Sequence, residues 1–140
     1  MIKKGRRLAL VVEDDPTLQR MMLAELEAAR FDVLAAYDFD TAVRHLTKSK
    51  PHLVCVDLGL PSESGYEVCE HIRRQPDLLS VPILVTSERS YPEDMAHAEE
   101  AGANAFLKKP FTMKRLMKYI TALLDGPSTS RPSIRRLRIS

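Results

Sequence analysis

The stretch Leu53-Val54-Cys55-Val56-Asp57 decides the fold, because it is a short apolar run that ends on a single carboxylate. Four consecutive apolar residues predict a strand that is buried on both faces, as in a parallel sheet covered by helices. The following residues, 58–65, are rich in glycine, serine and proline and predict a turn. A strand-terminating aspartate can cap the next helix, but that helix is predicted to begin near Ser64, too far downstream. An acid at the carboxyl end of a buried strand instead lies where open α/β sheets place their chemistry.

The rest of the chain alternates between two kinds of apolar pattern. Runs with the length of a strand occur at residues 8–12, 33–37, 83–86 and 105–107. Apolar residues recur at helical spacing within residues 16–29, 41–47, 64–74, 92–101 and 113–124. Asp15 followed by Pro16 predicts the start of the first helix, and Gly102 is placed to end the fourth in a left-handed conformation. Five strands alternating with five helices predict an α/β fold, with a parallel sheet covered by helices on both faces.

Composition places the chain among globular proteins. Its 140 residues suffice for one domain, with 44% hydrophobic and 29% charged residues. No apolar stretch approaches the ~20 residues of a membrane span, and acidic residues 13–15 interrupt the run behind the basic N-terminus, so we expect no signal peptide. Cys55 and Cys69 lack the spacing of a metal site or disulfide framework, which predicts reduced core thiols. These features together predict a cytoplasmic protein.

The net charge of +2 is distributed unevenly between the body of the chain and its two ends. Residues 8–125 hold 13 basic and all 19 acidic residues, a net charge of −6, whereas residues 1–7 and 131–138 each hold four basic residues and no acid. We predict a basic lead at residues 1–7, one folded domain at 8–125 and a basic, disordered tail at 126–140. The tail has too few large apolar side chains to offset the entropy of ordering it.

Polar residues follow four of the five predicted strands. They are Glu13 and Asp14 after the first strand, Asp57 after the third, Thr86 after the fourth and Lys109 after the fifth. In a sheet ordered 2-1-3-4-5 these residues meet at one edge, beside the crevice between strands one and three. Three carboxylates this close resist ionising together, and a divalent cation removes that conflict. All-oxygen ligands favour Mg²⁺, or Mn²⁺, over zinc.

This set of residues predicts phosphoryl transfer onto Asp57. The first turn is acidic and lacks glycines, and the chain has neither a GxGxxG nor a Walker A sequence, which argues against a nucleotide site. Asp57 would act as the nucleophile, while Mg²⁺ and Lys109 offset charge on the phosphoryl oxygens. The hydroxyl of Thr86 could hydrogen-bond a third oxygen.

At these residues the chain resembles the receiver domain of bacterial two-component response regulators, chemotaxis regulators included. The matching motifs are Val-Val-Glu-Asp-Asp (11–15), Val-Asp-Leu-Gly-Leu-Pro (56–61), Val-Thr-Ser (85–87) and Leu-Lys-Lys-Pro-Phe (107–111). One such motif would be weak, but four in the right order and spacing are specific. The resemblance covers residues 8–125 and implies a flavodoxin-like doubly wound (βα)5 fold with a five-stranded parallel sheet in the order 2-1-3-4-5.

The resemblance also implies a role for each site residue. Asp57 corresponds to the phospho-acceptor and also to a metal ligand. Asp14 corresponds to a direct metal ligand, Glu13 to a residue that holds a coordinated water, and the carbonyl of Gly59 to a further ligand. Lys109, rather than Lys108, matches the family lysine because it directly precedes proline, and the family usually holds this bond in the cis form. Thr86 and Phe106 occupy the two switch positions.

Three departures from the family pattern stand out. Ser64 stands at a position where family members frequently have an aspartate, and this difference affects a loop. Gly59 has no side chain to contact an attacking water, which leaves the dephosphorylation rate open. Phe106 lacks the hydroxyl of a tyrosine, so a switch at this position would work by packing alone.

Three functions remain open from the sequence. We favour a phosphorylatable switch that is not a dedicated multiple-turnover enzyme. The first alternative is a pseudo-receiver that acts as a phosphorylation-independent docking module; it has no need of the complete acid, threonine and lysine set. The second is an aspartate-nucleophile phosphatase or phosphotransferase; such enzymes commonly carry an acid two residues after the nucleophile, where this chain has Gly59. His45, His52, His71 and His97 are scattered, and we expect no ligand role for them.

The resemblance implies several partners. A histidine kinase or phosphotransfer protein would donate the phosphoryl group, and a downstream target protein would bind the surface of the fourth helix, fifth strand and last helix. We expect no direct DNA binding by the acidic receiver body. The basic tail could bind an acidic partner or a membrane surface.

Overall fold

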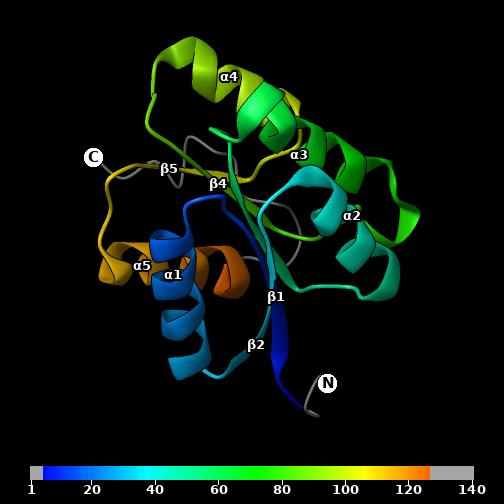
Figure 1. Ribbon diagram of the computed structural model, residues 1–140, viewed down its shortest axis with the longest axis vertical. Helices are drawn as coiled ribbons and strands as arrows, with labels where there is room; N and C mark the ends of the chain where they lie inside the picture. Colours follow the sequence, from blue (N-terminus) through cyan, green and yellow to red (C-terminus); the bar gives the residue numbers. More distant parts are fainter. Residues whose placement is uncertain (1–4, 127–140) are drawn as a thin grey trace.

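The computed structural model describes residues 5–126, which form one five-stranded parallel sheet in the order β2-β1-β3-β4-β5 (Figure 1). The strands are β1 (Arg7–Val12), β2 (Phe31–Ala36), β3 (Leu53–Asp57), β4 (Ile83–Ser87) and β5 (Ala105–Lys108). The helices are α1 (Pro16–Ala28), α2 (Phe39–Lys48), α3 (Ser64–Arg74), α4 (Pro92–Glu100) and α5 (Met113–Asp125), with two short 3₁₀ turns, η1 (Pro61–Glu63) and η2 (Pro76–Leu78). The predicted fold class and strand order are confirmed. Most of the predicted lead and tail lies outside the described residues.

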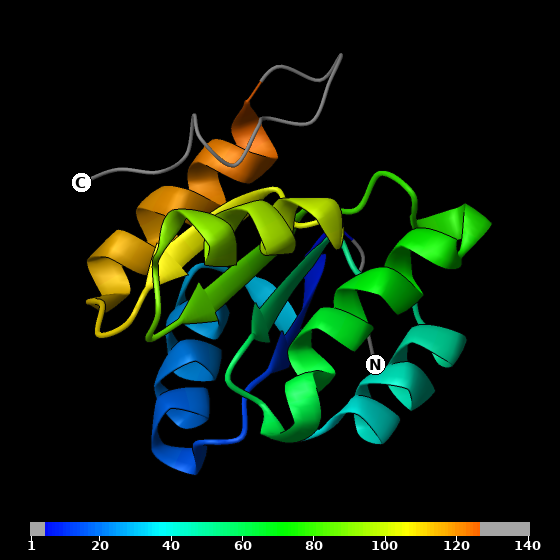
Figure 2. The same ribbon diagram turned by 90° about the horizontal axis from the view of Figure 1, so that it is seen from above.

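Helices cover both faces of the sheet (Figure 2), with α1 and α5 on one face and α2, α3 and α4 on the other. Side chains alternate along each strand, so β3 contributes to both cores. Leu53 and Cys55 pack with residues of α1 and α5, and Val54 and Val56 pack with residues of α2, α3 and α4. All four are at most 1% exposed. The apolar run at 53–56 is therefore continuous because both of its faces are covered.

Two predicted boundaries shift by a few residues for local reasons. Strand β2 begins at Phe31, which pairs with Arg7 and is buried, and ends before Tyr37, which is exposed. Helix α2 begins at Phe39 because the side chain of Asp38 caps it, accepting a hydrogen bond of 2.8 Å from the backbone N–H of Thr41.

The predicted helix signals at Asp15 and Gly102 are confirmed. The side chain of Asp15 accepts a hydrogen bond of 3.0 Å from the backbone N–H of Thr17, with Pro16 as the first helical residue. Gly102 follows α4 with φ at 110°, in the left-handed region. The Arg73 guanidinium donates to the Gly102 carbonyl at 2.9 Å and to Asn104 Oδ1 at 2.9 Å. Arg73 thus ties the end of α4 to α3, which the periodic pattern alone could not indicate.

Gly65 sets the position of α3 relative to the end of β3. A Cβ atom at this position would collide with the backbone of Asp57 and Leu58. The first turn of α3 therefore packs directly against the carboxyl end of β3 because residue 65 has no side chain. Tyr66, the next residue, lies in this first turn.

Both cysteines are free and buried. Burial raises the pKa of Cys55 and of Cys69 to about 12, as expected of core thiols. Within residues 5–126, no helix combines the length and apolar character needed to cross a membrane.

Candidate functional site

The register of the sheet explains why the predicted site residues meet. Val12 is paired with Val56, so Glu13 follows at the level of Asp57, which is itself paired with Thr86. In the pairing of β4 with β5, Thr86 lies opposite Leu107, and Leu107 is two residues before Lys109. Residues two apart in a strand share a face. Alternation therefore places all of these polar residues on one side of the sheet, at its carboxyl edge.

Three carboxylates form a cluster at this edge. Oxygen atoms of Glu13, Asp14 and Asp57 all lie within 4.8 Å of one another. Glu13 and Asp57 are 1% and 4% exposed, whereas Asp14 is open to solvent. Two buried carboxylates with an exposed third form a site that is open on one side, so a small ion or group can approach Asp57 from the side of Asp14.

Lys109 brings a positive charge into contact with two of these carboxylates. Its Nζ lies 3.0 Å from Oε1 of Glu13 and 3.2 Å from Oδ2 of Asp57. The bond between Lys109 and Pro110 is cis, as predicted from the family resemblance. The other oxygen of Asp57, Oδ1, accepts a hydrogen bond of 2.8 Å from the backbone N–H of Gly59. Asp57 is thus held by one contact at each oxygen.

The electrostatics of the cluster favour an added cation. The pKa of Glu13 is raised from 4.5 to about 7, chiefly by burial. A hydrogen bond from the Asp15 backbone and the nearby Lys109 lower this pKa, whereas the charge of Asp57 raises it. Burial acts to lower the pKa of Lys109, but the neighbouring Glu13 and Asp57 carboxylates outweigh it and raise that pKa above its ordinary value. One lysine is therefore shared between Glu13 and Asp57, and its single positive charge does not balance the negative charges of the cluster.

The residues present fit a divalent metal ion. Oε1 of Glu13 is a buried oxygen without a hydrogen-bond partner among the described residues, although Lys109 lies within ion-pair distance. That lysine is shared with Asp57, so the two carboxylates together have one cation between them. The donors are all oxygens, the ligand type of Mg²⁺ and Mn²⁺. The Gly59 backbone contacts Asp57 through its N–H, and metal ligation by its carbonyl stays a prediction.

The two predicted switch residues lie in different surroundings. Thr86 is 1% exposed and pairs with Asp57. Phe106 is 3% exposed and packs in the core under α2, α3 and α4, opposite Val85 on β4. Thr86 is therefore adjacent to the acidic cluster, and Phe106 is adjacent to α4.

The acidic cluster opens into a cavity of about 1220 Å³. Sequence reasoning found the polar residues at its base but missed much of its wall. The missed residues are Leu18 and Met21 of α1, Tyr66 of α3, and Arg89, Asp94 and His97 in and before α4. Met21 is 49% exposed and gives this wall an apolar side chain.

Tyr66 and His97 stack on each other across the cavity wall. Their ring centroids are 3.8 Å apart and the rings are inclined by only 10°. The apolar face of α4 is thin, since Met95 and Ala98 are its buried residues. The stack therefore adds a contact between α4 and α3. Pairings between distant helices leave no trace in local sequence spacing.

The other histidines have local structural roles. Nε2 of His45 lies 2.9 Å from the Ala35 carbonyl, and Nδ1 of His52 accepts a hydrogen bond of 2.9 Å from the backbone N–H of Leu8. His71 makes an edge contact with Phe39. Among the described residues, the acidic group around Asp57 is the cluster with metal-ligand geometry, and it includes no histidine.

Comparison with known proteins agrees with this geometry. The response regulator receiver domain family matches residues 9–121. The Escherichia coli K12 phosphate regulon transcriptional regulatory protein PhoB is 33% identical over 118 residues, covering 84% of this chain and 52% of PhoB. This chain spans about half the length of the curated relatives it matches.

Solved structures show the same fold. The signal receiver domain of a signal transduction histidine kinase from Syntrophus aciditrophicus is 30% identical, with a TM-score of 0.78 over 89% of this chain and 94% of that one. The receiver domain of the sensor histidine kinase PA1611 from Pseudomonas aeruginosa PAO1 is 27% identical, with a TM-score of 0.78 over 87% of this chain and 100% of that one. That structure carries a magnesium ion coordinated in its active site cleft. The family match, the fold and the acidic cluster together show that this chain belongs to the response regulator receiver domain family.

Proposed function

We propose that the protein is a phosphorylation switch in which Asp57 accepts a phosphoryl group with the help of Mg²⁺. The observation that carries the proposal is the position of Lys109, whose Nζ lies within 3.2 Å of both Asp57 and Glu13 in a cluster of three carboxylates. Such a cluster is suited to a ligand that brings both positive charge and phosphoryl oxygens.

The reaction is transfer of a phosphoryl group from a phosphohistidine of a histidine kinase or phosphotransfer protein. A carboxylate oxygen of Asp57 forms a bond to phosphorus as the bond from phosphorus to the imidazole nitrogen breaks, and that nitrogen keeps the electron pair. A bound Mg²⁺, or Mn²⁺, would offset charge on the phosphoryl oxygens. Asp14 and the Gly59 carbonyl would ligate it, with Glu13 holding a coordinated water. Lys109 compensates charge on a neighbouring phosphoryl oxygen.

The consequence of phosphorylation is a change at the surface formed by α4, β5 and α5. Thr86 is drawn toward the phosphoryl oxygens, which gives Phe106 room to repack beneath α4. A contact made in only the phosphorylated state is the differential interaction that such a shift requires. This surface then binds a downstream target protein. The receiver domain itself does not contact DNA, and it is not a dedicated multiple-turnover enzyme, because Gly59 offers no acid or base to assist hydrolysis.

A phosphorylation-independent docking module is the less favoured alternative. Docking requires a surface, but it does not require a buried cluster of Glu13, Asp57 and Lys109 whose charges are incompletely compensated. Retaining that cluster costs stability without benefit to such a module.

The test is incubation with acetyl phosphate and Mg²⁺, followed by intact-mass measurement. The parent protein should gain ~80 Da, the mass of one phosphoryl group on an aspartyl-phosphate intermediate. EDTA, or the substitution Asp57→Asn, should abolish the gain, whereas Asp77→Asn, on the exposed turn η2, should leave it unchanged. A parent protein that gains no mass while remaining folded would contradict the proposal.

A further inference from the structure

Gln19 is a polar residue on the buried face of α1. Gln19, Met22 and Leu26 form that face, and Gln19 is only 1% exposed. A helix that packs on a sheet usually presents apolar side chains to it, and burying a side-chain amide is costly unless the amide is hydrogen-bonded. The partners of the Gln19 amide therefore show why a polar side chain is present here.

The Gln19 amide bridges the ends of two neighbouring strands. Its Nε2 donates a hydrogen bond of 3.0 Å to the carbonyl oxygen of Ala36, the last residue of β2, and one of 3.2 Å to that of Glu13, which follows β1. Both acceptors are backbone carbonyls, and only the NH₂ side of an amide can donate to them, which fixes the orientation of the group. One buried side chain thus connects α1 to the carboxyl edge of the sheet at two points.

The backbone of Glu13 is therefore held at both of its polar groups. Its N–H donates to the Ala36 carbonyl at 3.0 Å, which extends the pairing of Val12 with Ala36 by one residue. Its carbonyl is held by Gln19, and Gln19 is held in turn by the same Ala36 carbonyl. The end of β2 is thus the fixed point from which the turn after β1 begins.

This turn carries two of the three clustered acids, and Asp14 depends on it most. The side chain of Glu13 has contacts of its own, since Oε2 accepts a hydrogen bond of 3.0 Å from the Asp15 backbone and Oε1 lies 3.0 Å from Nζ of Lys109. Asp14 is exposed, so its backbone rather than packing sets the place of its carboxylate. The peptide unit between Glu13 and Asp14 is planar, so fixing the Glu13 carbonyl also fixes the direction in which the chain enters Asp14.

We propose that Gln19 is a positioning residue for the metal site. By holding the Glu13 carbonyl, it keeps Asp14 where the oxygens of the three clustered carboxylates lie within 4.8 Å of one another. Gln19 does not itself ligate the ion. It acts through the backbone, so that a cation meets ligands already in place and does not have to order the turn. The inference rests on the proposed function in taking Mg²⁺ as the ion, but it does not require that Asp57 is phosphorylated.

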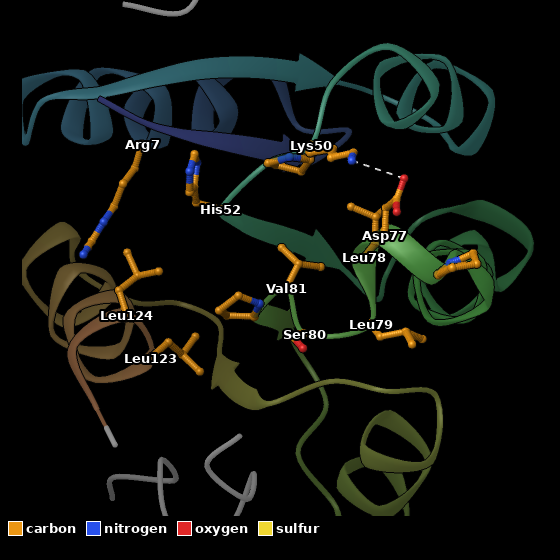
Figure 3. Close-up of a pocket in the computed structure, with 13 residues that line it drawn as sticks. Arg7, Lys50, His52, Asp77, Leu78, Leu79, Ser80, Val81, Leu123 and Leu124 are labelled. Atoms are coloured by element: carbon orange, nitrogen blue, oxygen red, sulfur yellow. Dashed lines mark ion pairs between the residues drawn. The ribbon is translucent and has the colours of Figure 1, made fainter. Parts of the chain in front are cut away.

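A purely structural role for Gln19 makes a different prediction. If the amide only satisfies two buried carbonyls, its loss lowers stability and leaves the metal site intact. His52 provides the matched control, because it forms a bond of the same kind at the other end of β1: its Nδ1 accepts a hydrogen bond of 2.9 Å from the backbone N–H of Leu8. His52 lies in the wall of a second cavity, of about 480 Å³, at the amino end of the sheet and opposite the acidic cluster (Figure 3).

The first test measures Mg²⁺ binding directly, by isothermal titration calorimetry of the full chain without a phosphoryl donor. Gln19→Met has nearly the same length but no donor, and it should weaken Mg²⁺ binding about 10-fold, the lower end of the effect of groups that orient metal ligands. Gln19→Asn keeps the amide but draws it back by one methylene, and it should also weaken binding. His52→Leu should bind as the parent does, and so should Leu26→Val, which loosens the same face of α1 away from the turn. Circular dichroism confirms that each variant is folded.

The second test measures how the rate of phosphorylation by acetyl phosphate depends on Mg²⁺. Gln19 acts on the backbone of the turn and not on Asp57, so Gln19→Met should raise the Mg²⁺ concentration for half-maximal rate about 10-fold and leave the rate at saturating Mg²⁺ unchanged. Parent-like Mg²⁺ binding in both Gln19 variants, or an equal loss in Leu26→Val, would overturn the inference. A parent protein that binds Mg²⁺ but gains no phosphoryl group would instead contradict the proposed function alone.

Discussion

Lys109 and Asp57 lie at the ends of β5 and β3, two strands separated by β4, and yet Nζ of Lys109 is 3.2 Å from Oδ2 of Asp57. The lysine side chain crosses the end of β4 to reach the carboxylate. The contact brings a positive charge to the carboxylate that would attack phosphorus. It also makes that charge compete with any metal ion for the same oxygens.

The first prediction follows from this competition. Lys109→Gln should slow phosphorylation of Asp57 by acetyl phosphate roughly 100-fold, the usual loss when one group that stabilises transition-state charge is removed. The same change should tighten Mg²⁺ binding several-fold, because the site loses a positive charge. Stopped-flow phosphorylation and a Mg²⁺ titration measure the two effects. Lys108→Gln, one residue earlier and exposed, is the control, and equal effects from both changes would refute the assignment.

The second prediction concerns pH and the metal-free protein. The pKa of Glu13 is raised from 4.5 to about 7, chiefly by burial. Protonated Glu13 therefore favours the folded state, and this stabilisation is complete below about pH 4.5 and lost as pH rises through 7. The loss should be on the order of 2 kcal/mol in the free energy of unfolding.

Urea unfolding at pH 5 and pH 8, without metal, measures this loss. Glu13→Gln should reduce the pH dependence relative to the parent, and comparing the two proteins cancels the contributions of other titrating groups. Added Mg²⁺ should restore stability at pH 8 in the parent. Parent and variant curves with the same pH dependence would show that Glu13 does not titrate in this range.

The third prediction removes one negative charge from the same cluster. Asp14→Ala should weaken Mg²⁺ binding and yet raise the melting temperature of the metal-free protein, because fewer like charges remain within 4.8 Å. Asp15→Ala is an unsuitable control, since Asp15 caps α1, whereas Asp40→Ala, at an exposed position of α2, is suitable. A metal-free Asp14→Ala protein that melts below its parent would count against charge repulsion in the cluster.

The fourth prediction concerns the path from Asp57 to α4. Thr86→Ala should still be phosphorylated, but chemical-shift changes along residues 88–120 should be smaller than in the parent. Thr47→Ala, whose hydroxyl bonds within α2, should respond as the parent does. Equal shift changes in all three proteins would rule out Thr86 as the coupling residue.

The fifth prediction concerns the stacked pair of Tyr66 and His97. An aromatic pair contributes about 0.5–1.5 kcal/mol beyond its buried area, and α4 has few other buried side chains. Tyr66→Leu should therefore speed amide hydrogen exchange in α4 by up to ~10-fold, because that energy opposes local opening. Tyr37→Leu, at an exposed tyrosine, should not. Unchanged exchange in the Tyr66 variant would show that the stack does not anchor the helix.

The fold and the base of the site could be predicted from sequence because both depend on local signals. A run such as 53–56 identifies a doubly covered strand, and Asp57, Thr86 and Lys109 each lie at a strand end. Once the strand order is known, the register brings them together. The expected cis bond before Pro110 is present as well.

The walls of the site could not be predicted because they depend on contacts between elements that are distant in sequence. Tyr66 and His97 are on different helices, and their stacking depends on how Gly65 lets α3 approach β3. The hydrogen bond between His52 and Leu8 joins two strand beginnings in the same way. A helical repeat indicates which face of a helix is buried, but not which side chain of another helix it meets.

The most direct measurement of the central claim is chemical trapping of the phosphorylated residue. The protein is incubated with acetyl phosphate and Mg²⁺, treated with borohydride, which reduces an acyl phosphate to an alcohol, and mapped by peptide mass spectrometry. The account predicts homoserine at position 57 and aspartate still present at positions 14 and 15. Homoserine at another acidic position, with residue 57 remaining aspartate in a protein that has gained a phosphoryl group, would contradict it.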